Sequence, residues 1–372
     1  MKQAFFFLGR LFRQMDKLML LTAAALSALS VLLLLGINDS GYVRLRVVQV
    51  QMIATLLGLL VALAVTAFDY RLLASLWKFY APLVVLLNLY TAFFGDYREG
   101  TSNRSWLDLG FVSIQPSEFL KIAFILTFSY HLSQVRETLN TSRTLLPLLA
   151  HGGAAVGLIL LQGDVGVAVI MAAIFVVMLF MAGLSRKLIF AGIGAFSALL
   201  PLAWIFFLSP YQKNRILALL YPDQYALSEA HQQLEGLLSI GSGQIFGIGV
   251  FSDSHNYVPE MYNDFIFTFL GEAFGFIGCF VVLAAYAFIC MRILKAALQS
   301  RDYLGRYLCI GVFAMLMAQI FVNISMCLML MPVIGVTLPL LSAGGSSVLS
   351  VYAGLGLVLS VGAASNRNMF SE

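Results

Sequence analysis

Two carboxylates stand just before a long apolar stretch. The segment YVPEMYNDFIFTFLGEAFGFIG, residues 257–278, carries Glu260 and Asp264 ahead of mostly apolar sequence. Because Pro259 disfavours helix in the residue before it, we expect a helix that begins after it, with Asn263 as N-cap and Asp264 in the first turn. Glu260 and Asp264, four residues apart, would then share one helix face. An ionised carboxylate there can act as a general base or hold a divalent cation, and simple capping is the alternative.

A second group of charged and aromatic residues lies between residues 104 and 121. Glu118 and Lys121 are three residues apart and can pair on one face of a helix. A structural ion pair is one interpretation. The other is a cationic cradle for a phosphate-bearing lipid, in which Arg104 gives a planar fork and Lys121 a point charge. Trp106 is more typical of an interfacial anchor than of a residue that stacks on a ligand.

Three further segments interrupt apolar sequence with polar residues. Asp164 lies at the tip of a hairpin, where turn chemistry alone explains Gly163-Asp164 and substrate binding is the alternative. Residues 338–347, which include Ser342 and Ser346, are glycine-broken and polar, so they must line a cavity or pack on protein. The glycine-rich run 241–249 lacks dinucleotide-fingerprint and P-loop spacing and is interpreted as a tight turn at the membrane surface, with permissive backbone near a ligand as the second interpretation.

Composition shows which elements must position these residues. The chain has 372 residues, of which 60% are hydrophobic and only 11% are charged, with a mean hydropathy of +0.91. Soluble domains carry about 25% charged residues, so this is an all-α polytopic membrane protein. The net charge of +4 is modest and gives no reason to expect a nucleic-acid partner. Four scattered cysteines form no metal-ligand pattern and are expected in the core.

We expect one domain, residues 1–372, with about ten transmembrane helices. A large extracytoplasmic loop, about 209–263, separates spans seven and eight, and short helices are expected to lie in it along the membrane surface. Lys and Arg concentrate in the loops that share a side with the N-terminus, which predicts that both termini are cytoplasmic. The expected spans are 18–37, 47–68, 72–94, 114–133, 144–162, 164–183, 188–208, 263–291, 305–331 and 345–366.

Five motifs, in order along nearly the whole chain, resemble the SEDS proteins (shape, elongation, division and sporulation), whose best-known members are RodA and FtsW. Any one of them is weak, but all five in order are specific. They are NRSWLDLGFVSIQPSEFLKIA at 103–123, QGDVGVA at 162–168, LLSIGSGQIFGIG at 237–249, VPEMYNDFIF with EAFGFIG at 258–278, and PVIGVTLPLLSAGGSS at 332–347.

The resemblance implies a peptidoglycan glycosyltransferase in the bacterial cytoplasmic membrane. Such enzymes polymerise lipid II, a disaccharide-pentapeptide on undecaprenyl pyrophosphate, at the outer face of that membrane, together with a class B penicillin-binding protein, a transpeptidase. The essential acid of the family matches Asp264, which makes it the candidate general base. The family's Trp and its Q-P-S-E-x-x-K motif match Trp106 and residues 115–121. The expected substrate-binding residues are Arg104, Trp106, Glu118, Lys121, Glu260, Asp164, Ser342 and Ser346.

The chain departs from the family pattern at several positions. The family usually has two acids where Glu272 is followed here by Ala273, and it has Pro, Phe and Tyr where Thr337, Leu340 and Ala343 stand. The candidate base is kept, whereas these changes alter its expected surroundings.

The residues leave two rival functions open. Intramembrane charges and broken helices also fit a transporter, or flippase, of lipid-linked precursors. A non-catalytic scaffold for a transpeptidase is the third interpretation. No resident cofactor is indicated, and a divalent cation, Mg²⁺ or Mn²⁺, is an alternative that the sequence does not decide; the metal is unknown.

Overall fold

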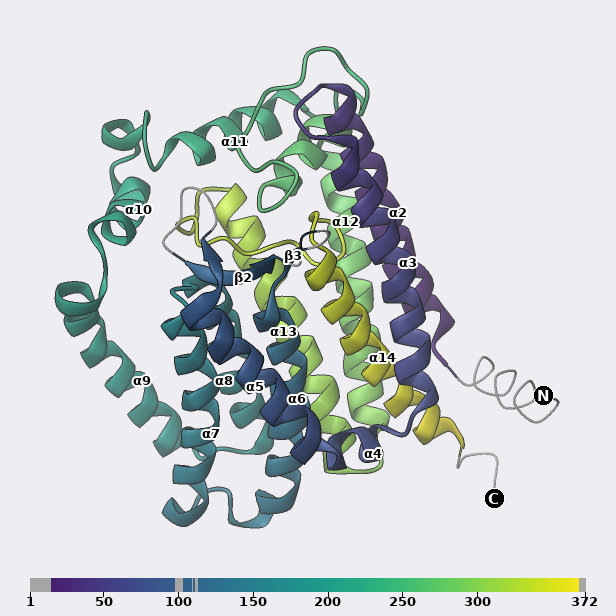
Figure 1. Ribbon diagram of the computed structural model, residues 1–372, viewed down its shortest axis with the longest axis vertical. Helices are drawn as coiled ribbons and strands as arrows, with labels where there is room; N and C mark the ends of the chain where they lie inside the picture. The colour runs from purple at the N-terminus through teal and green to yellow at the C-terminus, as the bar shows by residue number, and fades with distance from the viewer. Residues whose placement is uncertain (1–14, 98–102, 109, 111–112, 368–372) are drawn as a thin grey trace.

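The computed structural model describes residues 15–97, 103–108, 110 and 113–367 of the chain. In it the long helices stand side by side as a bundle, with short helices across one end (Figure 1). The helices are α2 (Lys17–Asp39), α3 (Leu45–Ala67), α4 (Tyr70–Ser75), α5 (Trp77–Phe94), α6 (Pro116–Val135), α7 (Ser142–Leu161), α8 (Val165–Ala182), α9 (Arg186–Leu202), α10 (Pro210–Leu220), α11 (His231–Ser242), α12 (Ile266–Gln299), α13 (Tyr303–Cys327) and α14 (Gly345–Arg367).

Nine helices within the described residues are long and apolar enough to cross a membrane. They are α2, α3, α5, α7, α8, α9, α12, α13 and α14, where α9 is counted together with a π-helical extension, Ala203–Phe207. Helix α6, with 20 residues, is more polar and is not among them. Each of the ten expected spans overlaps a long helix, and the helical membrane architecture is as expected. The number of crossings stays a prediction.

Acidic residues and a serine begin several of these helices by capping exposed backbone N–H groups. Asp16 accepts from the Met19 N–H at the start of α2, and Asp302 accepts from the Gly305 N–H at the start of α13. At α10, Ser209 and Gln212 form a reciprocal capping box. The short helices α10 and α11 and the 3-10 turn Pro222–Tyr225 fill the segment in which the sequence predicts surface helices.

Burial is uneven across the bundle. In α13 and α14, 72% and 78% of the most apolar window is buried, whereas in α9 the fraction is 0%. Helix α9 accordingly stands at the periphery of the molecule (Figure 1). The core therefore lies around α13 and α14, and α3, α6, α8 and α12 pack against these two helices.

Two features differ from the expected elements. The third span is interrupted at Leu76, which separates α4 from α5. A small antiparallel sheet follows α5, made of β1 (Asp96–Tyr97), β2 (Arg104–Asp108) and β3 (Ser113–Ile114), with β2 in the middle. Its strands are too short to show as a period-two pattern in the sequence.

Candidate functional site

Asp264 lies in a turn ahead of α12 and not in its first helical turn. Helix α12 begins at Ile266, so the predicted start at Asn263 is wrong. The cause is local. Glu260 adopts a left-handed φ of 57°, and both Asn263 and Phe265 donate their N–H groups to the Glu260 carbonyl. The Asn263 side chain donates to Glu260 Oε2 at 2.7 Å. Glu260 and Asp264 therefore do not share a helix face.

Side chains of α13 and of the loop after it hold the Asp264 segment in place by donating to its backbone carbonyls. Asn323 of α13 donates to the carbonyl oxygens of Asp264 and Val336, each at 2.7 Å. Ser342 donates to the Asn263 carbonyl at 2.6 Å and accepts from the Leu338 N–H. Ser342 is 2% exposed, so it positions the segment and does not face a substrate.

The loop after α13 also approaches the Asp264 carboxylate itself. A Cβ at Gly335, whose φ is 72°, would lie 3.6 Å from Asp264 Oδ2. At Gly166, in the first turn of α8, a Cβ would lie 2.2 Å from the Ile334 carbonyl oxygen. The two glycines therefore let this loop run between the Asp264 carboxylate and the start of α8. The Asp264 side chain itself is only partly buried.

A polar cavity of about 430 Å³ opens beside this segment. Tyr262 and Asn263, the two residues before Asp264, line it, and Arg44 and Arg46 line it from the start of α3. Ala343 lines it as well, at a position where the family pattern has Tyr. Sequence reasoning missed Arg44 and Arg46 as site residues, because basic residues in a loop indicate orientation in the membrane and not a binding site. The R-x-R spacing next to an apolar span was the available signal.

Glu118 and Lys121 form the predicted pair, deep in the protein. Lys121 Nζ lies 2.8 Å from Glu118 Oε1, and the two side chains are 1% and 4% exposed. Ser350 of α14 donates to Glu118 Oε2 at 2.7 Å. The pair therefore links α6 to α14. Lys121 faces Glu118 and lines neither the polar cavity nor a surface that a phosphate can reach in this structure.

Asp164 and Ser346 meet at the residue before α6. Gln115 donates its side-chain amide to Asp164 Oδ2 at 3.0 Å, and its N–H donates to Ser346 Oγ at 3.1 Å. Asp164 also caps α8 through the Val167 N–H at 3.0 Å. Burial raises the pKa of the Asp164 carboxyl, partly offset by the Val167 hydrogen bond. Asp164 therefore caps α8 at the tip of the hairpin, and its role in substrate binding stays a prediction.

Arg104 and Trp106 lie on the central strand β2. Trp106 pairs with Asp96 of β1 and is partly exposed. Arg104 Nη1 donates to the Phe93 carbonyl at 2.8 Å, at the end of α5, and the Arg104 N–H donates to the Gln162 carbonyl at 2.9 Å. Gln162 in turn donates to Asn88 of α5. The sheet thus fixes a guanidinium over the ends of α5 and α7.

Helix α12 is broken at Gly275, and the glycine-rich run fills the break. Gly275 has φ 65° and ψ −163°, which interrupts the helical hydrogen bonds. The Ile248 and Gly249 N–H groups donate to the carbonyls of residues 272 and 273, while the N–H groups of residues 276 and 277 donate to the carbonyls of residues 244 and 245. A Cβ at Gly247 would lie 2.2 Å from the Ala273 oxygen, so the approach requires glycine. The run is a backbone partner for α12 and not a simple surface turn.

Glu272, a buried carboxylate just before this break, forms hydrogen bonds with the loop that leads to Asp264. Glu272 Oε2 lies 3.1 Å from His255 Nδ1, and both side chains are fully buried. Glu272 Oε1 accepts from the N–H and the side chain of Asn256, at 3.0 and 2.6 Å, and from Ser242 at 3.1 Å. No local spacing signals the contact between His255 and Glu272, since the two residues are 17 positions apart in the chain.

The arrangement of possible metal-ligating side chains in the described residues does not favour a resident metal. No three His, Cys, Asp or Glu side chains come close enough to hold an ion in the part of the chain that the structure describes. Ca²⁺ and Mg²⁺ sites are built from several oxygen ligands. We therefore derive no step through a cation.

Comparisons with known proteins agree with this architecture and with the motifs. A family model described as "Cell cycle protein", for FtsW, RodA and SpoVE, matches residues 13–367. The peptidoglycan glycosyltransferase MrdB of Escherichia coli is 31% identical over 96% of this chain and 95% of its own length. The peptidoglycan glycosyltransferase RodA of Treponema pallidum is 28% identical over 94% and 97%.

Solved structures show the same fold. A chain from a study of the structural coordination of polymerization and crosslinking by a peptidoglycan synthase complex superposes with a TM-score of 0.79 at 28% identity, and the match covers 96% of this chain and 99% of that one. The rod shape determining protein RodA of Thermus thermophilus superposes with a TM-score of 0.69 at 26% identity, and the match covers 96% and 98%. The chain is a multi-pass membrane protein and belongs to the FtsW/RodA/SpoVE family, which is the SEDS family that its motifs resemble.

Proposed function

We propose that this protein is a peptidoglycan glycosyltransferase that polymerises lipid II, and that Asp264 is its general base. The observation that carries the proposal is a partly exposed carboxylate, fixed through its own backbone, directly after Asn263, which lines a cavity together with two arginines. Family membership supplies the reaction class, because the relatives named above are glycosyltransferases.

In the proposed reaction, Asp264 takes the proton from a hydroxyl of the acceptor sugar. The hydroxyl oxygen attacks the anomeric carbon of the donor, and a new glycosidic C–O bond forms. The bond between that carbon and the pyrophosphate oxygen breaks, and the lipid pyrophosphate leaves with the electron pair. A general base of this kind contributes about 10²–10⁴-fold to the rate. Arginine is suited to the charge that develops on the leaving group, because its planar fork matches phosphate geometry.

The charged and polar residues described above divide into two roles in this proposal. Arg44 and Arg46 bind the anionic parts of the substrate in the polar cavity, and Arg104 binds the pyrophosphate from the sheet. Glu118, Lys121, Asp164, Ser342 and Ser346 position the helices and loops, since all five are buried and hydrogen-bonded.

We also propose an orientation of the chain in the membrane and a protein partner. The Asp264 end faces the outside of the cytoplasmic membrane, and both termini are cytoplasmic, which agrees with the distribution of Lys and Arg. A class B penicillin-binding protein is the proposed partner. It would cross-link the glycan that this chain makes, in line with the synthase complex that shares the fold.

The test uses the purified full chain with a co-expressed class B transpeptidase. We expect Asp264→Asn to abolish glycan polymerisation from lipid II while the protein keeps its unfolding temperature in detergent. Asp253→Asn is the matched control, because Asp253 is an exposed acid of the same loop. Polymer formation by Asp264→Asn at the wild-type rate would refute the role of Asp264.

A liposome experiment separates the enzyme from a flippase. Lipid II is supplied only in the leaflet that faces the Asp264 end. A polymerase converts it to glycan there, whereas a flippase moves it to the other leaflet without changing it. Transfer without polymer would overturn the proposed activity.

A further inference from the structure

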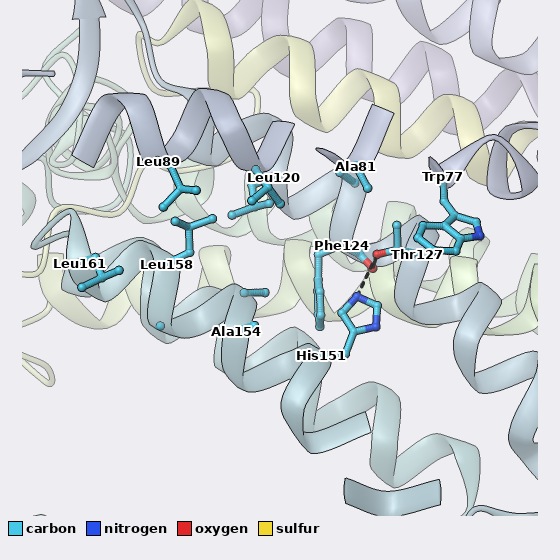
Figure 2. Close-up of a pocket in the computed structure, with 14 residues that line it drawn as sticks. Trp77, Ala81, Leu89, Leu120, Phe124, Thr127, His151, Ala154, Leu158 and Leu161 are labelled. Atoms are coloured by element: carbon cyan, nitrogen blue, oxygen red, sulfur yellow. Dashed lines mark hydrogen bonds between the residues drawn. The ribbon is translucent and has the colours of Figure 1, made fainter. Parts of the chain in front are cut away.

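An apolar slot runs along the helices beneath Arg104. Its volume is about 650 Å³, and α5, α6 and α7 line it. Figure 2 shows side chains of α5 and α6 along one side, from Trp77 to Leu89, and those of α7 along the other, from His151 to Leu161. Trp77 and Leu89 are twelve residues apart in one helix, so the slot extends about 18 Å. That length is more than half of the ~30 Å hydrocarbon core of a bilayer.

The imidazole of His151 and the hydroxyl of Thr127, which line the slot, already have partners. His151 Nε2 lies 3.2 Å from Thr127 Oγ1, and His151 Nδ1 lies 3.3 Å from His131 Nδ1 (Figure 2 draws the first contact). The rest of the lining is aliphatic or aromatic. Such a surface suits a hydrocarbon chain and disfavours a headgroup, whose polar atoms would stay unpaired there.

One end of the slot adjoins the sheet that carries Arg104. Leu161 lines that end, and the next residue, Gln162, accepts the Arg104 N–H through its carbonyl oxygen. The Arg104 guanidinium donates to the Phe93 carbonyl at the same end of α5. A ligand that carries a phosphate group on a long hydrocarbon chain can therefore place the phosphate near Arg104 and the chain in the slot.

We infer that this slot holds the first part of the polyisoprenoid chain of the lipid-linked donor. The inference rests on the proposed function and adds a tail site to it. Bilayer lipid is as apolar as the slot, so the slot gains little hydrophobic energy from the chain. Its contribution is orientation: a chain held along α5 and α7 fixes where the pyrophosphate lies relative to the acceptor.

Two glycines of α7 provide a matched test. Gly157 lines the slot, and a Cβ there would meet no atom within 4 Å, so a larger side chain enters the slot without a clash. Gly153, one turn away, also has open space around its Cβ but does not line the slot. Both changes to leucine favour helix, so both variants are expected to fold.

The readout is the ratio of the KM for a long-chain donor to the KM for a donor whose tail is cut to one isoprene unit. We expect Gly157→Leu to raise this ratio by about threefold to tenfold, because Gly157 lies four residues, about 6 Å, from Leu161 at the Arg104 end and a tail of one unit ends before it. Gly153→Leu should keep the wild-type ratio. An unchanged ratio in Gly157→Leu, or an equal rise in both variants, would overturn the tail site.

A binding measurement keeps the tail site separate from the activity. Photoactivatable polyprenyl phosphate and photoactivatable phosphatidylglycerol are each incorporated into lipid vesicles that contain either the wild-type protein or Gly157→Leu. We expect the polyprenyl probe to label slot residues of the wild type more strongly than the phospholipid probe does, and to lose that labelling in Gly157→Leu. Equal labelling by both probes would show an ordinary bilayer contact and refute the inference. If the protein made no glycan but the polyprenyl label were selective, only the proposed function would fail.

Discussion

Two buried glutamates, Glu118 and Glu272, meet their partners in different ways. Glu118 pairs with Lys121 on its own helix and takes one further hydrogen bond from α14. The four hydrogen-bond contacts of the Glu272 carboxylate all come from the 242–256 segment, which crosses the end of the bundle. The first carboxylate therefore joins two helices of the bundle, α6 and α14, and the second holds a loop against a broken helix. The same residue type supports the core in one place and the approach to Asp264 in the other.

The comparison predicts the largest loss of stability at Lys121. Lys121→Met leaves Glu118 as a buried carboxylate without its cation, and removing one partner of such a pair costs about 3–5 kcal/mol. We expect a large fall in the unfolding temperature of the purified protein. The double variant Lys121→Met with Glu118→Gln removes the stranded charge and should recover most of the loss. A single variant as stable as the wild type would show that the pair does not support the core.

A smaller and more local effect is expected at Glu272. Glu272→Gln keeps the shape but removes the charge that accepts from His255 and Asn256, and a hydrogen bond to a charged group contributes about 1.5–3 kcal/mol. Amide hydrogen exchange should speed up in residues 250–258 and stay unchanged in α6. Faster exchange in α6 as well would contradict the division between core and loop.

The smallest effect is expected at His255. His255→Gln can still donate to Glu272, so the loss is about 1 kcal/mol, the typical worth of one hydrogen bond. His255→Leu, which cannot donate, should behave like Glu272→Gln in the same exchange measurement. Equal exchange in the two His255 variants would mean that the histidine contributes by packing alone.

The fold and part of the site follow from local sequence. Runs of about 20 apolar residues predicted where the long helices lie, and the i, i+3 spacing predicted the Glu118–Lys121 pair. The turn chemistry of Gly163-Asp164 predicted the turn between α7 and α8, where Asp164 also caps α8. Each of these rests on residues that are near one another in the chain.

Features that depend on distant partners were not predictable. Asn263 has the side chain of an N-cap, but Ser342 and Glu260 take its hydrogen bonds and α12 starts later. The break at Gly275 depends on a segment 26–31 residues earlier, residues 244–249, that supplies the missing backbone partners. The polar cavity combines the start of α3, residues 108, 110 and 113 from the end of β2 to the start of β3, and the loops before α12 and α14, and no local pattern brings these four segments together.

The break in α12 limits how this protein can vary. Residues 244–249 meet the opened helix in a register set by four backbone hydrogen bonds, much as one strand meets another. Adding or deleting one residue in that run would shift every bond by one position and leave amide groups without partners inside the protein. Variation in length is therefore expected on either side of this run and not within it, so the number of residues between Gln244 and Gly249 is a structural constant of the chain.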